Sequence, residues 1–328
     1  MRQRNSFQNR QPMDLILPEY QDIEKAHERI APYIHRTPVL TSQGINRLFD
    51  AEIFFKCENF QKAGAFKFRG ATNALMMLDK ESAGRGVGTH SSGNHAAALA
   101  LAAGMRGIDA YIVMPHTAPQ IKKDAVKAYG GKITFCEPTL ESREKTMEQV
   151  IRQTGAVFIP SYNHFDIISG QGTAAKELIE DTGNLDMVLA PVGGGGLMSG
   201  TAIATTAMLP DAKVIAAEPA NADDACRSFH AGEIFPSVHP DTIADGLLTS
   251  LGTMTFAIIR RKVHDVVTVT EGDIIDAMRM IWERMKIIVE PSGAVPFAVI
   301  TGNRIDCKGK RVGIILSGGN VDLGKLPF

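Results

Sequence analysis

The stretch PVGGGGLMSG, residues 191–200, contains four consecutive glycines where an apolar run meets a helical pattern. The run MVLAPV at 187–192 predicts a buried strand, and the residues after the glycines predict a helix over 197–208. Successive glycines let backbone N–H groups converge on an anion at the start of a helix. A flexible turn is the alternative, but the flanking strand and helix favour a phosphate site. Its residues are Gly193, Gly194, Gly195 and Gly196.

The same turn departs from two common nucleotide-binding motifs. Neither Gly193-x-Gly195 nor Gly194-x-Gly196 is followed by a third glycine or alanine at the spacing of the dinucleotide fingerprint. The lysine of a P-loop is also missing. The turn therefore fits one phosphate monoester better than a pyrophosphate, which disfavours a nicotinamide oxidoreductase.

Strand and helix patterns alternate along the chain, which predicts an α/β fold with parallel sheets covered on both faces. The expected strands are 52–57, 108–114, 132–136, 156–160, 187–192, 213–218 and 312–317. The expected helices are 94–104, 119–129, 141–153, 171–182, 197–208 and 271–287.

The composition narrows the class of protein. The chain has 328 residues, 44% of them hydrophobic, so it can bury a sizeable core. A net charge of -1 gives no basis for binding nucleic acid or an anionic membrane surface, and the apolar runs are too short to span a membrane. The four cysteines are scattered without a CxxC pair, which favours the cytoplasm.

Two further turns follow strand patterns. In THSSGNHAAALALAA (89–103), the residues Ser91, Ser92, Gly93 and Asn94 offer hydroxyl and amide groups at a helix start. They predict either a carboxylate site or a plain helix cap, with equal weight. His95 follows them, and a satisfied core histidine is the commoner fate of such a residue. In LSGGNVD (316–322), Ser317 lies at the end of a strand, where α/β folds place ligands.

The stretch KAGAFKFRG (62–70) places Lys67 between Phe66 and Phe68. Local spacing leaves open whether Lys67 is a surface lysine or a nucleophile in an apolar pocket. The phosphate turn, the carboxylate turn and the serine at a strand end together favour the nucleophile. They describe a site for pyridoxal phosphate, whose aldehyde reacts with an amine, and apolar walls lower the pKa of a lysine.

The chain resembles the fold-type II (tryptophan synthase β-like) pyridoxal-phosphate enzymes, and within them the serine racemase and serine/threonine dehydratase group. The likeness runs from about Asp22 to the C-terminus and includes FFKCENFQK, SGQGTAAKEL, AAEPANADDA, TIADGL and LSGGNVDL. It implies a homodimer of two-domain subunits, each domain with a mainly parallel twisted sheet flanked by helices. The expected divisions are a disordered tail over 1–17, a large cofactor-binding domain over 18–80 and 165–328, and a small domain over 81–164.

The resemblance also implies roles for individual residues. Lys67 resembles the lysine that binds the cofactor and acts as a base on one face of the substrate. Ser92 resembles the acid or base on the other face, and two-base racemization needs both. The loop 91–95 matches the substrate-carboxylate site, from Ser91 to His95. The other residues matched to cofactor contacts are Phe66, Asn94, Tyr162, the four glycines 193–196 and Ser317.

Two ion or nucleotide sites follow from the same resemblance. Glu218, the Ala222 carbonyl and Asp224 match a site for Mg²⁺, Ca²⁺ or Mn²⁺, with Asp186 contributing through water, although an acidic turn alone is more often only solvated. A site for ATP as an activator matches Ser42, Lys62, Tyr129, Lys286 and Asn320.

The expected reaction is racemization of L-serine to D-serine, with β-elimination of serine to pyruvate and ammonia. The alternative is a dedicated dehydratase that acts on serine, threonine or 3-hydroxyaspartate, although no strong basic cluster marks a site for a second carboxylate. A binding protein that kept the fold without catalysis is a further alternative, and the intact Lys67 argues against it.

Overall fold

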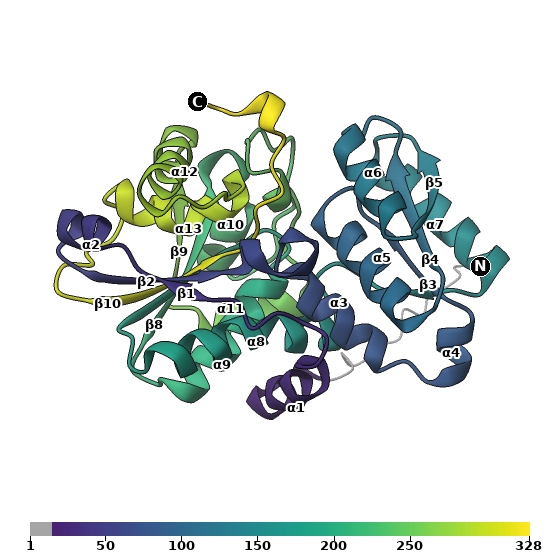
Figure 1. Cartoon of the computed structure of the whole chain (residues 1–328), viewed down its shortest axis with the longest axis horizontal. Helices are drawn as coiled ribbons and strands as arrows, with labels where there is room; N and C mark the ends of the chain where they lie inside the picture. Colours follow the sequence, from purple (N-terminus) through teal and green to yellow (C-terminus); the bar gives the residue numbers. More distant parts are fainter. Residues whose placement is uncertain (1–14) are drawn as a thin grey trace, which may run out of the picture.

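The computed structural model of the chain describes residues 15–328. Of the tail expected over 1–17, residues 1–14 lie outside the described residues. Two separate sheets, each flanked by helices, lie side by side with α3 (Lys67–Met76) between them (Figure 1). Lys67 is thus the first residue of the helix that lies at the junction of the two sheets.

The larger sheet has six strands in the order β1-β2-β10-β7-β8-β9. All neighbouring strands are parallel except β1 and β2. The bounds are β1 (Val39–Leu40), β2 (Glu52–Cys57), β7 (Met187–Pro191), β8 (Lys213–Pro219), β9 (Asp265–Val269) and β10 (Arg311–Leu316). Parallel strands end at one edge of a sheet, so the residues that follow β7 and β10 meet there.

The smaller sheet has four parallel strands in the order β5-β4-β3-β6. The bounds are β3 (Val87–His90), β4 (Ala110–Pro115), β5 (Lys132–Cys136) and β6 (Val157–Phe158). This sheet lies within the small domain expected over 81–164. The precise borders of the two domains stay a prediction.

Helices cover both faces of the larger sheet, because alternate residues of its strands face opposite sides. In β10, Ile314 packs in one core with α12 and α13, whereas Ile315 packs in a second core with α8 and α9. The α-helices are α1 (Tyr20–Ile30), α2 (Gln43–Phe49), α3 (Lys67–Met76), α4 (Lys80–Gly84), α5 (Asn94–Arg106), α6 (Gln120–Ala128), α7 (Leu140–Thr154), α8 (Phe165–Thr182), α9 (Gly196–Met208), α10 (Asp224–Ala231), α11 (Thr253–Lys262), α12 (Glu271–Met285) and α13 (Pro291–Thr301). Short 3₁₀ helices are η1 (Glu58–Phe60), η2 (Lys62–Gly64), η3 (Ala220–Ala222), η4 (Asp245–Leu247) and η5 (Leu323–Lys325).

The predicted fold class is confirmed, and several element bounds differ from the sequence expectation. Helix α8 begins at Phe165, six residues before the expected start at 171. The glycines in this stretch allow close helix packing, since a Cβ on Gly170 would lie 2.6 Å from the Cα of Gly70 in α3. The structure agrees with the strand expected before the 91–95 turn, which is β3, whereas β1, β9 and helix α3 have no counterpart among the expected elements. Within residues 15–328, no helix combines the length and apolarity needed to cross a membrane.

Candidate active site

Lys67 begins α3 beside the end of β10. The segment before it is held against that strand end, because the Phe66 amide donates a 3.0 Å hydrogen bond to the Ser317 carbonyl and Ala65 pairs with Gly318. The Lys67 Nζ lies 5.1 Å from the centre of the Phe66 ring and donates to the Ser161 carbonyl at 2.8 Å. The structure therefore brings Lys67, Phe66 and Ser317 together, as predicted.

Burial increases the fraction of the Lys67 amine that is neutral. Burial lowers the pKa of the Lys67 amine to about 8, and the nearby Glu290 carboxyl acts in the opposite direction. An uncharged amine is the form that attacks an aldehyde. The interpretation of Lys67 as a surface lysine is wrong, because its amine lies among protein groups.

The glycine turn leaves β7 and starts α9 at Gly196. Gly195 has φ +86°, and a Cβ on Gly193 would lie 2.8 Å from the Leu247 backbone, so other residues are disfavoured at both positions. The Thr255 hydroxyl donates to the Gly194 carbonyl at 2.9 Å and fixes the turn. Because the first amides of α9 have no partner within the helix, the turn has the donors and the positive helix end that a phosphate requires.

Tyr162 lies directly against this turn. A Cβ on Gly194 would come within 2.3 Å of the Tyr162 ring, and one on Gly196 would come within 3.0 Å of the Tyr162 side chain. The absence of side chains at these glycines is therefore what lets the ring approach. Burial raises the pKa of the Tyr162 hydroxyl, which keeps it a neutral donor and acceptor.

The loop 91–95 joins β3 to α5 and offers the groups expected to bind a carboxylate. The Ser92 side chain is half-buried, and Gly93 forms the N-cap of α5 with open space beside its Cα. The His95 side chain belongs to the core, because it is 2% exposed and its Nε2 lies 3.1 Å from the Ile159 carbonyl oxygen. Burial lowers the pKa of His95 to about 3, so the imidazole is neutral and its contribution to an anion site is limited to its backbone N–H.

The structure also identifies Glu290, a site residue that the sequence analysis missed. The Asn94 amide donates to its Oε1 at 2.8 Å and the Asn320 backbone N–H donates to its Oε2 at 3.1 Å. Glu290 is 3% exposed, and burial raises the pKa of its carboxyl to about 8. It fixes Asn94, the expected ligand of the cofactor ring. The only sequence signal is an acid between an apolar run and Pro291, which by itself indicates a helix start.

The predicted metal ligands Glu218, Ala222 and Asp224 lie together where β8 leads through η3 into α10. Glu218 is fully buried and accepts hydrogen bonds from the backbone N–H groups of Ala225 and Cys226, at 2.9 and 2.8 Å. Asp224 is 1% exposed, and neither of its carboxylate oxygens has a hydrogen-bond partner. Burial raises the pKa of Glu218 well above its usual range and that of Asp224 to about 6.

Two buried carboxyl groups without a cationic partner fit a divalent cation, which would supply the missing charge. No cluster of three or more His, Cys, Asp or Glu side chains suited to a metal occurs in the described part of the chain, so backbone carbonyls such as that of Ala222 would have to complete the coordination. The contribution expected from Asp186 is wrong. Asp186 lies beside Lys213 at the beginning of β8, whereas Glu218 is five residues further along that strand, roughly 16 Å away.

Two of the five residues matched to the nucleotide site share a surface pocket. Lys286 and Asn320 line a hollow of about 370 Å³ between η1 and the segment after α12. Lys62 belongs to the adjacent η2, with its Nζ 5.9 Å from the centre of the Phe68 ring. Ser42 caps α2 and Tyr129 ends α6, and neither lines this pocket. The nucleotide site stays a prediction.

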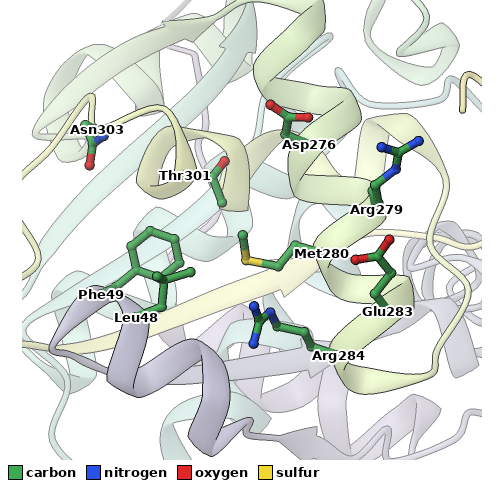
Figure 2. A pocket seen from close by; sticks show the side chains of 9 residues that line it. All are labelled: Leu48, Phe49, Asp276, Arg279, Met280, Glu283, Arg284, Thr301 and Asn303. Carbon is green, nitrogen blue, oxygen red and sulfur yellow. The ribbon is translucent and has the colours of Figure 1, made fainter.

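A second hollow, of about 510 Å³, lies on the surface between α2 and α12 (Figure 2). Figure 2 shows Met280 and Arg284 extending from α12 toward Phe49 of α2. None of the residues predicted for the cofactor, substrate or metal lines it. It has no lysine or other nucleophile comparable to Lys67, so the chemistry belongs at the junction of the two sheets.

Comparisons with known proteins agree with this site. The family described as "Pyridoxal-phosphate dependent enzyme" matches residues 30–318. The chain is 53% identical to a serine racemase from Arabidopsis thaliana, covering 93% of each chain. It is 52% identical to a β-hydroxyaspartate dehydratase from Paracoccus denitrificans, covering 96% of this chain and all of the relative. The solved structure of a serine racemase from Dictyostelium discoideum superimposes with a TM-score of 0.89 at 50% identity, over 93% of this chain and 99% of that one.

These matches extend over nearly the whole chain and include the lysine, the glycine turn and both sheets. The identities lie far above the level at which only a fold is shared. The resemblance seen in the sequence is therefore confirmed, and with it the fold-type II architecture. The chain belongs to the family of pyridoxal-phosphate dependent enzymes.

Proposed function

We propose that the protein is a pyridoxal-phosphate dependent racemase that interconverts L-serine and D-serine and also eliminates water from serine to give pyruvate and ammonia. The observation that carries the proposal is the Lys67 amine, whose pKa burial lowers to about 8 and which lies beside the Phe66 ring and the Ser161 carbonyl. Serine racemases at about 50% identity over most of the chain support the reaction, and hydroxyaspartate dehydratases among the relatives support the elimination.

The residues around Lys67 fit the cofactor. The glycine turn offers backbone donors for its phosphate, Phe66 offers a ring to pack against, and Ser317 offers a neutral hydroxyl near the strand end. When bound, pyridoxal phosphate draws electrons from the α-carbon of an amino acid and thereby acidifies its α-hydrogen. The amides at 91–95 orient the substrate carboxylate. Lys67 takes the α-proton on one face, and the Ser92 hydroxyl gives a proton to the other face of the same carbon.

Elimination uses the same first proton transfer. Once Lys67 holds the α-proton, the β-hydroxyl of serine leaves if it is protonated before Ser92 acts. The ratio of the two products therefore depends on how quickly Ser92 delivers its proton. Substituting Ser92 changes this ratio more directly than it changes binding.

A dedicated β-hydroxyaspartate dehydratase is the second candidate. It is favoured by the 52% identity to the Paracoccus enzyme over all of that relative. The two candidates differ in product: a racemase gives D-serine from L-serine, whereas the dehydratase gives a keto acid and ammonia from 3-hydroxyaspartate.

The test measures D-serine and pyruvate from L-serine, and ammonia from 3-hydroxyaspartate, in parallel. We expect D-serine from the wild type, loss of D-serine with retained pyruvate in Ser92→Ala, and partial recovery of D-serine in Ser92→Thr, which keeps the hydroxyl. Absence of D-serine, together with rapid release of ammonia from 3-hydroxyaspartate, would establish the dehydratase instead.

The proposal includes the remaining expectations on cofactors, assembly and location. Glu218, the Ala222 carbonyl and Asp224 would hold Mg²⁺, Ca²⁺ or Mn²⁺, which is supported by the unpaired buried oxygens of Asp224. ATP would activate the enzyme at the pocket that contains Lys286 and Asn320. The enzyme would act as a homodimer in the cytoplasm, which agrees with four cysteines that are all free.

A further inference from the structure

One ion pair joins the segment 81–164, which carries the smaller sheet, to the rest of the described chain. It links Lys122 in the first turn of α6 to Asp245 in η4. Each of the other ion pairs found within residues 15–328 has both partners on the same side of this division. Among the residues that the structure describes, Lys122 and Asp245 are thus the only oppositely charged pair that bridges the two parts.

The two partners lie beside elements that carry the active site. Asp245 belongs to η4, whose Leu247 backbone lies against Gly193 of the phosphate turn, and the next residue, Gly246, donates its N–H to the Ser292 hydroxyl at 3.0 Å. On the other side, α6 packs against α5, the helix that follows the 91–95 loop. The pair therefore spans from the phosphate side of the site to the carboxylate side.

The buried carboxyl of Glu290 provides a second sign that the pair borders the site. Asp245 raises and Lys122 lowers the pKa of that carboxyl, after the larger effect of its burial. Glu290 in turn accepts the hydrogen bond from Asn94. Both charges of the pair are therefore close to the residues expected to contact the cofactor.

We propose that Lys122 and Asp245 form a latch that holds the 81–164 segment closed over the Lys67 site. The side chain of Lys122 is 24% exposed and that of Asp245 is 51% exposed, so water competes for both charges. Such a partly exposed pair is weak. A weak bond suits a latch, because the closed form must open in each turnover for substrate to enter and product to leave. The pair biases the population of closed molecules without fixing them.

The test measures amide hydrogen exchange of the holoenzyme over residues 89–95 and 116–123, with and without L-serine. Lys122→Ala and Asp245→Asn should each speed exchange of both segments by about two- to fivefold, the factor that corresponds to a surface ion pair. The charge-swapped double variant Lys122→Asp with Asp245→Lys should restore exchange toward the wild-type rate. Lys123→Ala is the matched control, because Lys123 donates to the His116 carbonyl within its own segment.

Ionic strength gives an independent readout that a purely structural role would not change. Raising salt from about 0.05 M to about 0.5 M should speed exchange in the wild type and have little effect in Lys122→Ala, where no pair is left to screen. The KM for L-serine should rise by the same factor as exchange, with kcat little changed. If Lys122→Ala exchanges like Lys123→Ala, or if the two single effects simply add in the double variant, the latch does not exist. Amide exchange does not depend on which product is formed, so this result stands apart from the proposed reaction.

Discussion

A cation bound at Glu218 and Asp224 should stabilise the enzyme. The effect of Asp224→Asn on thermal stability should therefore be neutral or favourable without the metal and unfavourable with it. Without a cation, the wild type buries a carboxylate whose two oxygens have no partner. Burying such a group without a partner lowers the free energy of unfolding by about 1–3 kcal/mol or more. Asp224→Asn removes the charge, so in EDTA the variant should be at least as stable as the wild type.

With saturating Mg²⁺ the order should reverse. A cation at 100 times its dissociation constant stabilises the folded state by about 2.7 kcal/mol. At about 2.1 cal/mol/K per residue, the unfolding entropy of 328 residues is about 0.7 kcal/mol/K, so 1 kcal/mol shifts Tm by about 1.5 °C and the wild type should gain about 4 °C. Asp224→Asn should gain little, because it lacks one anionic ligand.

The measurement is thermal unfolding of the holoenzyme in EDTA and in MgCl₂, followed by circular dichroism. Asp223→Asn is the matched control, because the Asp223 carboxylate neighbours Asp224 but is 43% exposed and already paired with Arg227. The control should respond to Mg²⁺ like the wild type. A wild-type Tm that does not respond to Mg²⁺, Ca²⁺ or Mn²⁺ would refute the site, as would an undiminished response in Asp224→Asn.

Three further predictions concern Lys67, Glu290 and Arg69. Because the pKa of Lys67 is about 8, cofactor-free enzyme should take up pyridoxal phosphate about tenfold faster per pH unit below pH 8 and level off above it, as followed by absorbance. Burial raises the pKa of Glu290 from 4.5 to about 8, so this carboxyl stabilises the fold below pH 4.5 and the contribution is lost as the pH rises to 8. In chemical unfolding, Glu290→Gln should therefore lose less unfolding free energy between pH 4.5 and pH 8 than the wild type. Arg69→Met should lower the unfolding free energy by about 3–5 kcal/mol, because it leaves the Glu58 and Glu177 carboxylates buried without this partner, whereas exposed Arg152→Met should have little effect in the same assay.

The parts of the site that follow one another along the chain were predictable from the sequence. The glycine turn can be recognised in the sequence because a strand pattern, four glycines and a helix pattern follow one another directly. Lys67 could be interpreted only together with the three turns, since a lysine between two phenylalanines does not by itself indicate a buried nucleophile. These signals are local, and the structure only had to bring them together at the ends of β7, β10 and β3.

The parts that depend on distant partners were not predictable. Arg69 and Glu177 are 108 residues apart, yet Arg69 donates two hydrogen bonds to that carboxylate at 2.8 and 2.9 Å, and both side chains are buried. In the sequence each looks like an ordinary exposed charge. The same holds for Lys122 with Asp245. Burial and pairing of charges are properties of the tertiary fold, so no local pattern reveals them.

Burial increases the neutral fraction of the Lys67 amine, because it lowers the pKa of that amine to about 8. Lys67 occupies the first turn of α3, where the positive end of the helix disfavours a cation. Glu290 is the carboxyl that acts against them, but burial raises its own pKa to about 8, so near neutral pH it is mostly protonated and its attraction is small. The two groups are therefore linked: a molecule with protonated Glu290 has a Lys67 amine of still lower pKa. Replacing Glu290 by glutamine should then move the midpoint of cofactor uptake only slightly to lower pH, whereas a large shift to lower pH would show that Glu290 is ionised in the wild type and would contradict this account.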